Sequence, residues 1–507
     1  MKLINKVITF CILFFFIFPL FNSVGSLQIS GEKLNEKIIR IAQYPRETGS
    51  DLSFEIIFNY TWIANNTLYK FTCTELSLDE LMDYGERPLN ISNFDLLLVG
   101  VSFKGYTRDF RYPELGENIR QFLLQGGGYL GICAGATRAT QGFENPNKLY
   151  KKHSNRCVFK IANVYANSDL NQESQYIHKC ASITRINQGL IPLEKKVLRN
   201  SSNPIFADYP YETINITYGG GPGLYPANAS DPNLGEITPL LVINEELMDT
   251  KPIHWYVKGL LPFAWWKLLK VETDMYGQYG GIATTYGLGR VVIYTGQPEI
   301  QLILNGTIEE SPGRSTGYGI RFPRFRVVYS WVGTPMNMSH NWWIHRRSAA
   351  WIAGVPDADL PPCNEFMVFM DKPQFRFGHQ LYIRDHQVGS YFNFSLLGPF
   401  FNFPWIEKSF FMKKVAGKFV SKRLLDVVSK VGKTIIIGDI TVEAYAENSH
   451  KVEFYLDGEL EYTDTEHPFT WKLDKNNLNG VHSLELRAYD EYGSCACDGS
   501  EFFFYNF

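Results

Sequence analysis

The sequence predicts an α/β protein with a mainly parallel sheet, followed by a separate all-β sandwich. Short apolar runs alternate with helix-period segments from about residue 36 to residue 354, and this order favours a parallel sheet with crossover helices. From about residue 431 to residue 507 apolar and polar residues alternate, as they do in half-buried strands. The chain has 507 residues and is 45% hydrophobic and 15% aromatic, which is enough apolar material for several cores.

The periodicity places the elements of the α/β region in order along the chain. Leu115, Ile119, Phe122 and Leu123 recur at helical spacing, whereas the other short apolar runs have the length of buried strands. Three prolines, at positions 356, 361 and 362, end the region. The expected elements are strands at 38–42 and 94–99, a helix at 115–123, strands at 128–133 and 290–296, and a closing helix at 342–353.

The C-terminal region is predicted to be a sandwich of immunoglobulin-like type. Asp457-Gly458 is a hairpin signal, and further turn signals recur about every eight to twelve residues. The stretch 452–458, with Pro468, Trp471 and residues 488–490, resembles the Ig-like repeats at the ends of secreted prokaryotic proteins. This resemblance implies a spacer or adhesion module. The inward positions are Ile440, Val442, Ala444, Ala446, Val452, Phe454, Leu456, Leu484, Leu486 and Ala488.

The N-terminus has the pattern of a secretory signal. Lys2 and Lys6 precede an apolar run at 7–21, and Val24 and Ser26 are placed for cleavage before Leu27. An uncleaved anchor helix is the alternative, but fifteen residues fall short of the ~20 that cross a bilayer. We therefore divide the chain into a signal peptide (1–26), an α/β domain (27–355), a connecting region (356–430) and the Ig-like sandwich (431–507).

Glycosylation acceptors and cysteines also bear on whether the protein is exported. Nine Asn-x-Ser/Thr sequons are more than chance usually gives, which favours a secreted or extracytoplasmic surface glycoprotein. Of the eight cysteines, Cys11 would leave with the signal, and the odd number that remains implies at least one thiol without an intrachain partner. The acceptors are Asn59, Asn65, Asn90, Asn200, Asn215, Asn228, Asn305, Asn337 and Asn393.

Charge and composition restrict the possible partners. With 49 Lys+Arg against 52 Asp+Glu, the chain lacks the basic character of nucleic-acid-binding proteins. Cys495 and Cys497 face one way on an expected strand, but a zinc site needs four ligands, so we expect no metal and no cofactor. The expected partner is a small molecule or a cell-surface component.

A basic amphipathic helix is expected at 408–425 in the connecting region. Lysines and an arginine flank the apolar series Phe411, Val415 and Phe419. Such a helix can lie on an anionic membrane surface as a peripheral contact. The alternative is a connecting helix packed on a neighbouring domain, and it is preferred because an apolar stripe usually belongs to a core.

A candidate nucleophile lies in the segment 126–136, which reads GGGYLGICAGA. A strand that ends in G-x-C-x-G and opens a helix is typical of a nucleophile elbow, where small neighbours permit a strained turn. Gly131 and Gly135 therefore argue against the alternative that Cys133 is only a buried apolar residue. The start of a helix lowers the pKa of a thiol, and the amide of Ala134 would point at an oxyanion formed there.

This block resembles the elbow of class I glutamine amidotransferase-like proteins, most closely the family named for the N-terminal domain of biotin–protein ligases. Further matches follow in the family's order at 94–99, at 218–222 (YGGGP) and at 281–299 (GIATTYGLGRVVIYTGQPE), and together they cover about three hundred residues. The resemblance implies a flavodoxin-like three-layer sandwich and a Cys-His-Glu triad. By this resemblance the nucleophile falls on Cys133 and the orienting carboxylate on Glu299.

Two positions depart from the family's pattern. Gln297 stands at the position of the family's histidine, and glutamine cannot accept a proton from a thiol or return it to a leaving amine. After Val99 the family's Pro-Gly-Gly, which supplies an oxyanion amide, is replaced by Gly-Val-Ser-Phe-Lys. Val101 or Ser102 could still present a backbone N–H there.

Two functions therefore remain open, and the first of them is preferred. One is a degenerate amidotransferase-like domain, a pseudoenzyme that binds a small ligand or surface partner above Cys133 and has little glutaminase activity. The other is an extracytoplasmic cysteine hydrolase that acts on an amide or γ-glutamyl substrate. Gln297 favours the first hypothesis and the intact elbow favours the second. His254, His340 and His345 are the histidines that could replace the base, but none has a spacing signal for that role.

Overall fold

The computed structural model describes most of the chain between residues 34 and 505. The described ranges are 34–45, 54–100, 109–146, 149–167, 191–199, 203–218, 221–246, 254–258, 265–269, 275–300, 302–304, 307–312, 327–332, 338–339, 341–364, 366–373, 379–391, 434–475 and 478–505. The expected signal peptide and the basic helix at 408–425 lie outside these ranges. Glu36–Phe507 forms one compact unit, and the description below concerns this unit.

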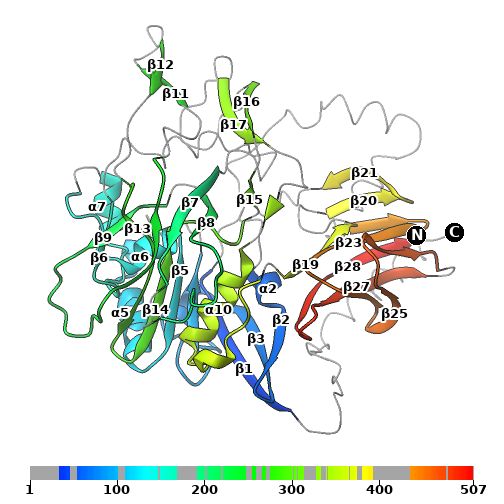
Figure 1. The fold of residues 1–507 in the computed structure, drawn as a ribbon, viewed down its shortest axis with the longest axis horizontal. Helices are drawn as coiled ribbons and strands as arrows, with labels where there is room; N and C mark the ends of the chain where they lie inside the picture. The colour runs from blue at the N-terminus through cyan, green and yellow to red at the C-terminus, as the bar shows by residue number, and fades with distance from the viewer. Residues whose placement is uncertain are drawn as a thin grey trace, which may run out of the picture. The chain divides into compact units, whose positions relative to one another are not determined.

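The α/β part is a mixed sheet with helices (Figure 1). Its strands are β1 (Asn35–Gln43), β2 (Tyr60–Ala64), β3 (Thr67–Glu75), β4 (Leu96–Val99), β5 (Gly128–Ile132), β6 (Val164–Ala166), β7 (Ile191–Val197), β8 (Thr213–Tyr218), β9 (Leu224–Pro226), β10 (Thr238–Ile243), β13 (Tyr279–Tyr286) and β14 (Gly289–Tyr294). Its helices are α2 (Phe54–Phe58), α3 (Leu78–Leu81), α5 (Pro113–Leu124), α6 (Ala134–Ala139), α7 (Leu149–Asn155) and α10 (Trp342–Ile352), with 3-10 turns η1 (Asp109–Arg111) and η3 (Asp357–Asp359).

Three short strand pairs complete the list for this part. They are β11 (His254–Lys258) with β12 (Trp265–Leu269), β15 (Leu302–Ile303) with β18 (Met338–Ser339), and β16 (Thr307–Pro312) with β17 (Val327–Val332).

Four neighbouring strands of the sheet run parallel in the order β1, β4, β5 and β14. Ile41 of β1 pairs with Leu96 of β4, Leu98 with Leu130 of β5, and Leu130 with Val292 of β14. Beyond β14 the sheet continues through the antiparallel strands β13, β10, β7 and β8. The expected parallel strands are therefore present, and a large antiparallel extension is added to them.

Both faces of the parallel strands are buried. Leu97, Tyr129 and Ile293 point into one apolar cluster, which they share with residues of α5. Their neighbours Leu98 and Leu130 point into a second cluster, which contains residues of α2 and α10. Continuous burial on both faces explains why these strands are near-continuous apolar runs in the sequence.

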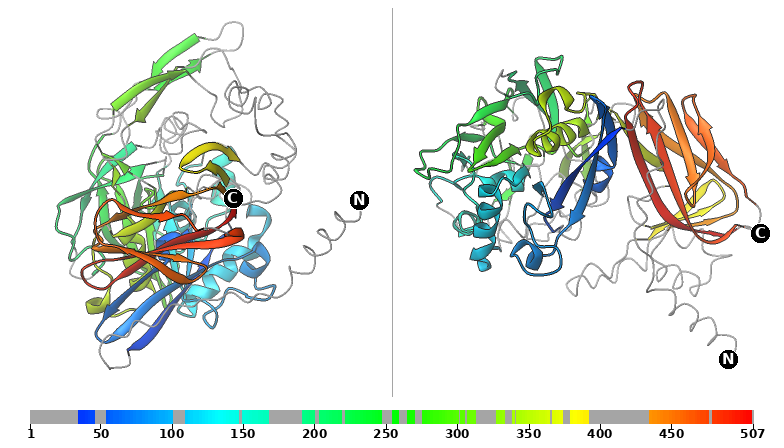
Figure 2. Two further views of the ribbon diagram at one scale, coloured as in Figure 1. Left: turned by 90° about the vertical axis from the view of Figure 1, so that its right-hand side faces the viewer. Right: turned by 90° about the horizontal axis from the view of Figure 1, so that it is seen from below.

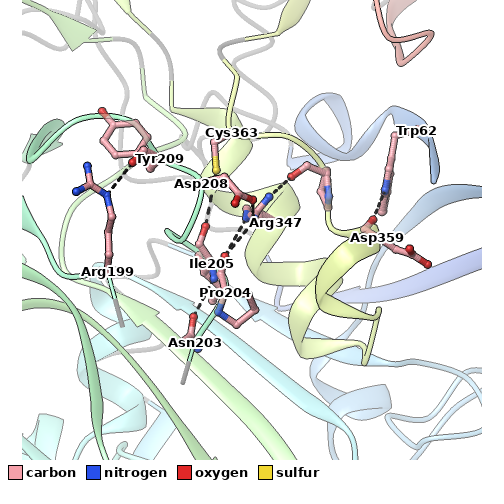
Figure 3. A network of polar contacts seen from close by, with 11 residues as sticks. Trp62, Arg199, Asn203, Pro204, Ile205, Asp208, Tyr209, Arg347, Asp359 and Cys363 are labelled. Carbon is pink, nitrogen blue, oxygen red and sulfur yellow. Dashed lines mark hydrogen bonds and ion pairs between the residues drawn. The ribbon is translucent and has the colours of Figure 1, made fainter. Parts of the chain in front are cut away.

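Helix α10 is held by arginines that donate to backbone carbonyls. The Arg347 guanidinium lies 2.9 Å from the Pro204 carbonyl oxygen and 2.7 Å from that of Pro361, and it contacts the Asp208 carboxylate at 2.5 Å. Figure 3 shows these contacts, with the Cys363 thiol directed at the carbonyl of Ile205. One buried side chain therefore joins the closing helix to the segment before β8 and to the proline-rich segment after α10.

The C-terminal part is an Ig-like sandwich of two sheets. Its strands are β19 (Met367–Lys372), β20 (His379–Ile383), β21 (His386–Tyr391), β22 (Thr434–Ile437), β23 (Ile440–Glu447), β24 (Lys451–Leu456), β25 (Glu459–Asp464), β26 (Phe469–Leu473), β27 (Asn479–Tyr489) and β28 (Cys495–Tyr505). One sheet has the order β19-β23-β26, and the other β21-β20-β22-β28-β27-β24-β25. Figure 2 shows the strands of these two sheets, which are coloured from yellow through orange to red, packed as two layers.

The sandwich uses strands from the region that the sequence assigned to a connection. β19 pairs with β23 and β20 pairs with β22, although β19 and β20 precede residue 431. The expected inward residues Val442, Phe454 and Leu486 are each buried. β28 also pairs with β2 of the α/β part, where Tyr60 is opposite Ala496.

We predict that replacing Arg347 with Met lowers the free energy of unfolding by about 2 kcal/mol or more, because the carbonyls of Pro204 and Pro361 lose their donor. The matched control is Asp208→Asn. The Asp208 carboxylate is 71% exposed, so its loss should cost less than about 1 kcal/mol. Urea unfolding of the wild type, Arg347→Met and Asp208→Asn measures the loss of unfolding free energy in each variant. Equal losses in the two variants would contradict this account of Arg347.

Candidate functional site

Cys133 lies at the turn between β5 and α6. Its backbone has φ 52° and ψ −106°, and it is the residue that precedes the helix. Its N–H donates to the Tyr294 carbonyl at 2.8 Å, which fixes the turn to the end of β14. A non-glycine residue with positive φ is strained, and such strain is retained where surrounding contacts impose it.

Two glycines allow the close contact of the strand and the helix. A Cβ at Gly135 would lie 1.9 Å from the Val99 carbonyl oxygen, and one at Gly131 would lie 2.8 Å from the Gly135 oxygen. The Tyr129 hydroxyl donates to that same oxygen at 2.8 Å. Any larger residue at position 135 would therefore push α6 away from β4.

The thiol of Cys133 is buried and protonated near neutral pH. Burial, and after it the negative charge of Glu299, raises the pKa of the Cys133 thiol to about 12. The backbone N–H of Ala134 and the Lys195 ammonium act against these effects. The sequence suggested a thiol activated by the helix start, but desolvation is the larger effect here.

Gln297 and Glu299 follow the end of β14. Both residues are 4% exposed, and the backbone N–H of Gln297 donates to the Thr217 carbonyl at 2.8 Å. Gln297 Oε1 and Glu299 Oε2 are buried and accept no hydrogen bond from the residues that the structure describes. The charge of Glu299 acts on the pKa of Cys133, and the Cys133–Glu299 pairing that the family resemblance implies stays a prediction.

His345 lies beside Glu299. Its Nε2 is 3.5 Å from Glu299 Oε2, and both side chains are buried. The ring packs edge-on against Phe54 and Phe58, with centroid distances of 5.6 and 6.5 Å. Within the described part of the chain, neither ring nitrogen makes a hydrogen bond. Of the three histidines considered from the sequence, His345 is the one whose side chain the structure describes, and it lies beside Glu299.

Lys195 is a residue of this site that the sequence analysis missed. It lies on β7 and is fully buried, and its Nζ donates to the Gly280 carbonyl and to Thr295 Oγ1, both at 3.3 Å. Burial lowers the pKa of Lys195 to about 7, opposed by the charge of Cys133. The signal was present: Leu193, Lys195 and Val197 alternate on one face of a strand, so the lysine occupies an inward position.

Several candidate residues lie where the structure gives no side-chain information. Val101, Ser102 and His340 fall outside the described residues, and of His254 only the backbone position, at the start of β11, is described. The second oxyanion donor therefore stays a prediction. In the described ranges there is no group of three or more His, Cys, Asp or Glu residues that could hold a metal ion.

Five of the nine sequons are in the described ranges, and three of these asparagines are exposed: Asn59, Asn65 and Asn228. Asn65 donates to the Asp359 carboxylate, and Asn59 donates to the Cys497 carbonyl at 3.2 Å. No helix in the described part of the chain is long and apolar enough to span a membrane.

Comparisons with known proteins identify the C-terminal domain. Residues 429–486 match the family model of the bacterial Ig domain, which confirms the Ig-like prediction for this region. The search of curated proteins found no match. One similar solved structure contains fibronectin(III)-like modules of Clostridium thermocellum CbhA, with 24% identity over 14% of this chain and 86% of that chain and a TM-score of 0.13.

Solved structures with similarity over about half of the chain are distant. The glutaminase domain of Trypanosoma brucei CTPS, with bound acivicin, is 11% identical over 51% of this chain and 86% of that chain, with a TM-score of 0.27. A β-galactosidase from Bacillus circulans sp. alkalophilus is 8% identical over 51% of this chain and 28% of that chain, with a TM-score of 0.24. At these TM-scores neither similarity assigns a fold or a function.

We predict that Gly135→Ala lowers the free energy of unfolding by about 3 kcal/mol, because the added methyl group would overlap the Val99 carbonyl. Gly116→Ala in α5 is the matched control. Its Cβ would meet only ordinary contacts at 3.6 and 3.8 Å, so this variant should gain about 0.5–1 kcal/mol of stability. Denaturant unfolding distinguishes the two, and a Gly135→Ala protein as stable as wild type would contradict the described contact.

A second prediction concerns the pH dependence of stability. Between the folded pKa of Lys195, about 7, and its ordinary value of 10.5, the unfolded chain binds a proton that the folded chain lacks. Lys195 therefore makes stability rise with pH in this window. Cys133 has the opposite effect above its ordinary pKa of 9.0, because the folded thiol keeps its proton.

The measurable window is accordingly pH 7 to 9. The free energy of unfolding of the wild type should rise across it more steeply than that of Lys195→Met. Lys196→Met, a change at the exposed neighbouring residue, should keep the wild-type slope. Identical slopes in the wild type and in Lys195→Met would show that Lys195 is protonated normally in the folded protein.

Proposed function

We propose that the α/β part is an amidotransferase-like domain of flavodoxin-like fold that hydrolyses an amide or γ-glutamyl bond through Cys133. The geometry of the elbow supports this proposal most directly. A cysteine with φ 52° sits between a buried parallel strand and a helix, and the N–H of Ala134 interacts with its sulfur. A backbone donor at this point can stabilise an oxyanion when the sulfur attacks a carbonyl carbon.

The polar groups around the thiol fit a ligand that carries N–H donors. Gln297 Oε1 and Glu299 Oε2 are buried acceptors without a hydrogen-bond partner among the described residues. A buried acceptor left unpaired costs about 1–3 kcal/mol, and a carboxamide or amine of a ligand would remove that cost. This favours amide-bearing and amino-acid-like substrates over apolar ones.

Binding with little turnover is the second candidate function. Gln297 at the family's base position and the raised thiol pKa favour it, since a protonated thiol without a base attacks slowly. In this case Cys133 would line a ligand pocket, and the protein would be a pseudoenzyme. The hydrolase is preferred because two basic side chains are buried in this part of the fold: His345 lies 3.5 Å from Glu299, and Lys195 binds Thr295 two residues before Gln297.

The test uses the whole mature chain and the chromogenic amide L-γ-glutamyl-p-nitroanilide. We predict release of p-nitroaniline by the wild type, and loss of that release by more than about 10²-fold in Cys133→Ala, which removes the nucleophile. Cys363→Ala, which removes a thiol on the α10 side of the domain, is the control and should keep the activity.

Absence of Cys133-dependent turnover would contradict the hydrolase. If L-glutamine or the anilide then raises the melting temperature of the wild type without being cleaved, the binding function replaces it. A ligand that binds only the folded state at 100 times its Kd adds about 2.7 kcal/mol, which such a measurement detects.

The proposed location is outside the cytoplasm, as a secreted or surface-attached protein. The signal-like N-terminus and the number of sequons support export, and the bacterial Ig domain fits a spacer or adhesion role at a surface. Residues 408–425 would then make any peripheral contact with an anionic membrane.

Expression in a host of the native type should give a chain that begins near Leu27 and carries glycans on at least some acceptors, of which Asn59, Asn65 and Asn228 are exposed. N-terminal sequencing and glycopeptide mass spectrometry measure both features. Recovery of Met1 from a cytoplasmic fraction would contradict the proposed export.

A further inference from the structure

Lys195 is a buried amine that the fold does not explain. Its side chain points inward from β7 and is fully buried, whereas the next residue, Lys196, is exposed. In the described part of the chain no carboxylate forms an ion pair with it, and its two hydrogen bonds go to neutral oxygens at 3.3 Å. Burying an ammonium group without a counter-charge is costly, so a structural role alone is a poor explanation.

The amine lies beside the peptide that leads to Gln297. Its hydrogen-bond partner Thr295 directly follows Tyr294, whose carbonyl binds the N–H of Cys133. A Cβ at Gly296 would lie 3.0 Å from Nζ of Lys195. The lysine therefore reaches the same strand end from which the family's histidine would project.

We infer that Lys195 is the proton acceptor and donor for Cys133, in the role that the family pattern assigns to residue 297. This inference rests on the proposed hydrolase and adds the base that it lacks. No hydrogen bond joins Nζ to the Cys133 sulfur in the structure. The proton therefore passes through one water molecule, or directly after rotation of the flexible lysine side chain.

The pKa shifts of the two groups favour a neutral amine on Lys195 and a neutral thiol on Cys133. The pKa of Lys195, about 7, leaves the amine uncharged and able to accept a proton at slightly alkaline pH, and the thiol is still protonated there. The titratable group that acts on Lys195 is Cys133 at the elbow, and Glu299 after β14 acts in turn on Cys133. The paired neighbours of Lys195, Ile214 and Ile243, carry no charge.

The reaction balances without a further reactant except water. The neutral amine takes the proton of the S–H group as the sulfur forms a bond to the amide carbonyl carbon, and the carbonyl π electrons move to oxygen. Collapse of this intermediate breaks the C–N bond, and the Lys195 ammonium gives its proton to the leaving amine. Water then attacks the thioester and gives a proton to Lys195, which returns it to the sulfur as the C–S bond breaks.

His345 is the competing base, and its surroundings make it less suitable. Its ring is packed between Phe54 and Phe58, and the polar group beside it is Glu299 rather than the thiol. The pKa of Cys133 responds to Lys195 and Glu299, and that of Lys195 responds to Cys133. The charge that acts on the Cys133 thiol from the basic side is thus that of Lys195.

The experiment measures acylation of Cys133 by p-nitrophenyl acetate, followed by mass spectrometry of the Cys133 peptide, from pH 5.5 to 9.5. The wild-type rate should rise through an apparent pKa near 7 and then level off. The acylation rate of Lys195→Met should lack the rise near pH 7, called the step below, and should be about 10²–10⁴-fold lower than that of the wild type at pH 8. Lys196→Met should keep the wild-type pH profile, and His345→Asn is measured alongside as the test of the competing base.

Each outcome decides one point. Acylation at Cys133 with the same pH profile in Lys195→Met overturns the role of Lys195 and leaves the hydrolase standing. Loss of the step in His345→Asn instead assigns the base to the histidine. No acylation of Cys133 in the wild type defeats the hydrolase itself. If Lys195→Met does not fold, a wild-type profile without a step near pH 7 still overturns the inference.

Discussion

The close contact between α6 and the ends of β4 and β5 determines the position of every group at the site. It exists because Gly135 and Gly131 have no side chain in a space where a Cβ would lie within 3 Å of backbone atoms. With the helix held there, Cys133 adopts positive φ and its N–H bonds the end of β14. Thr295, which follows Tyr294 at the end of β14, is therefore brought to the turn that carries Cys133.

Burial then controls the chemistry of these groups. Desolvation raises the pKa of the thiol and lowers the pKa of the lysine, so both groups tend toward their neutral forms. A neutral thiol beside a neutral amine needs no charge separation at rest, and the charges form only as the proton moves. The carboxylate of Glu299 would stabilise positive charge that develops nearby.

The sequence predicted the parallel strands, α5, α10 and the Ig-like sandwich because each has a clear period or motif. Its matches to a family pattern also predicted that Cys133, Gln297 and Glu299 lie near one another, which stays a prediction. It did not predict that β19 and β20 pair with the sandwich, since pairing between distant segments leaves no local signal. Lys195 was missed for a related reason: a lysine in a strand is normally exposed, and only the alternation with Leu193 and Val197 marked it as inward-facing.

The most direct measurement is the pKa of the Lys195 amine in the intact protein. NMR of protein labelled with ¹³C at lysine Cε, with the Lys195 signal identified by its loss in Lys195→Met, gives this value. The account predicts a signal that titrates near pH 7 and shifts when Cys133 is alkylated. A Lys195 signal that titrates near the ordinary lysine value of about 10.4 and ignores alkylation of Cys133 would contradict it.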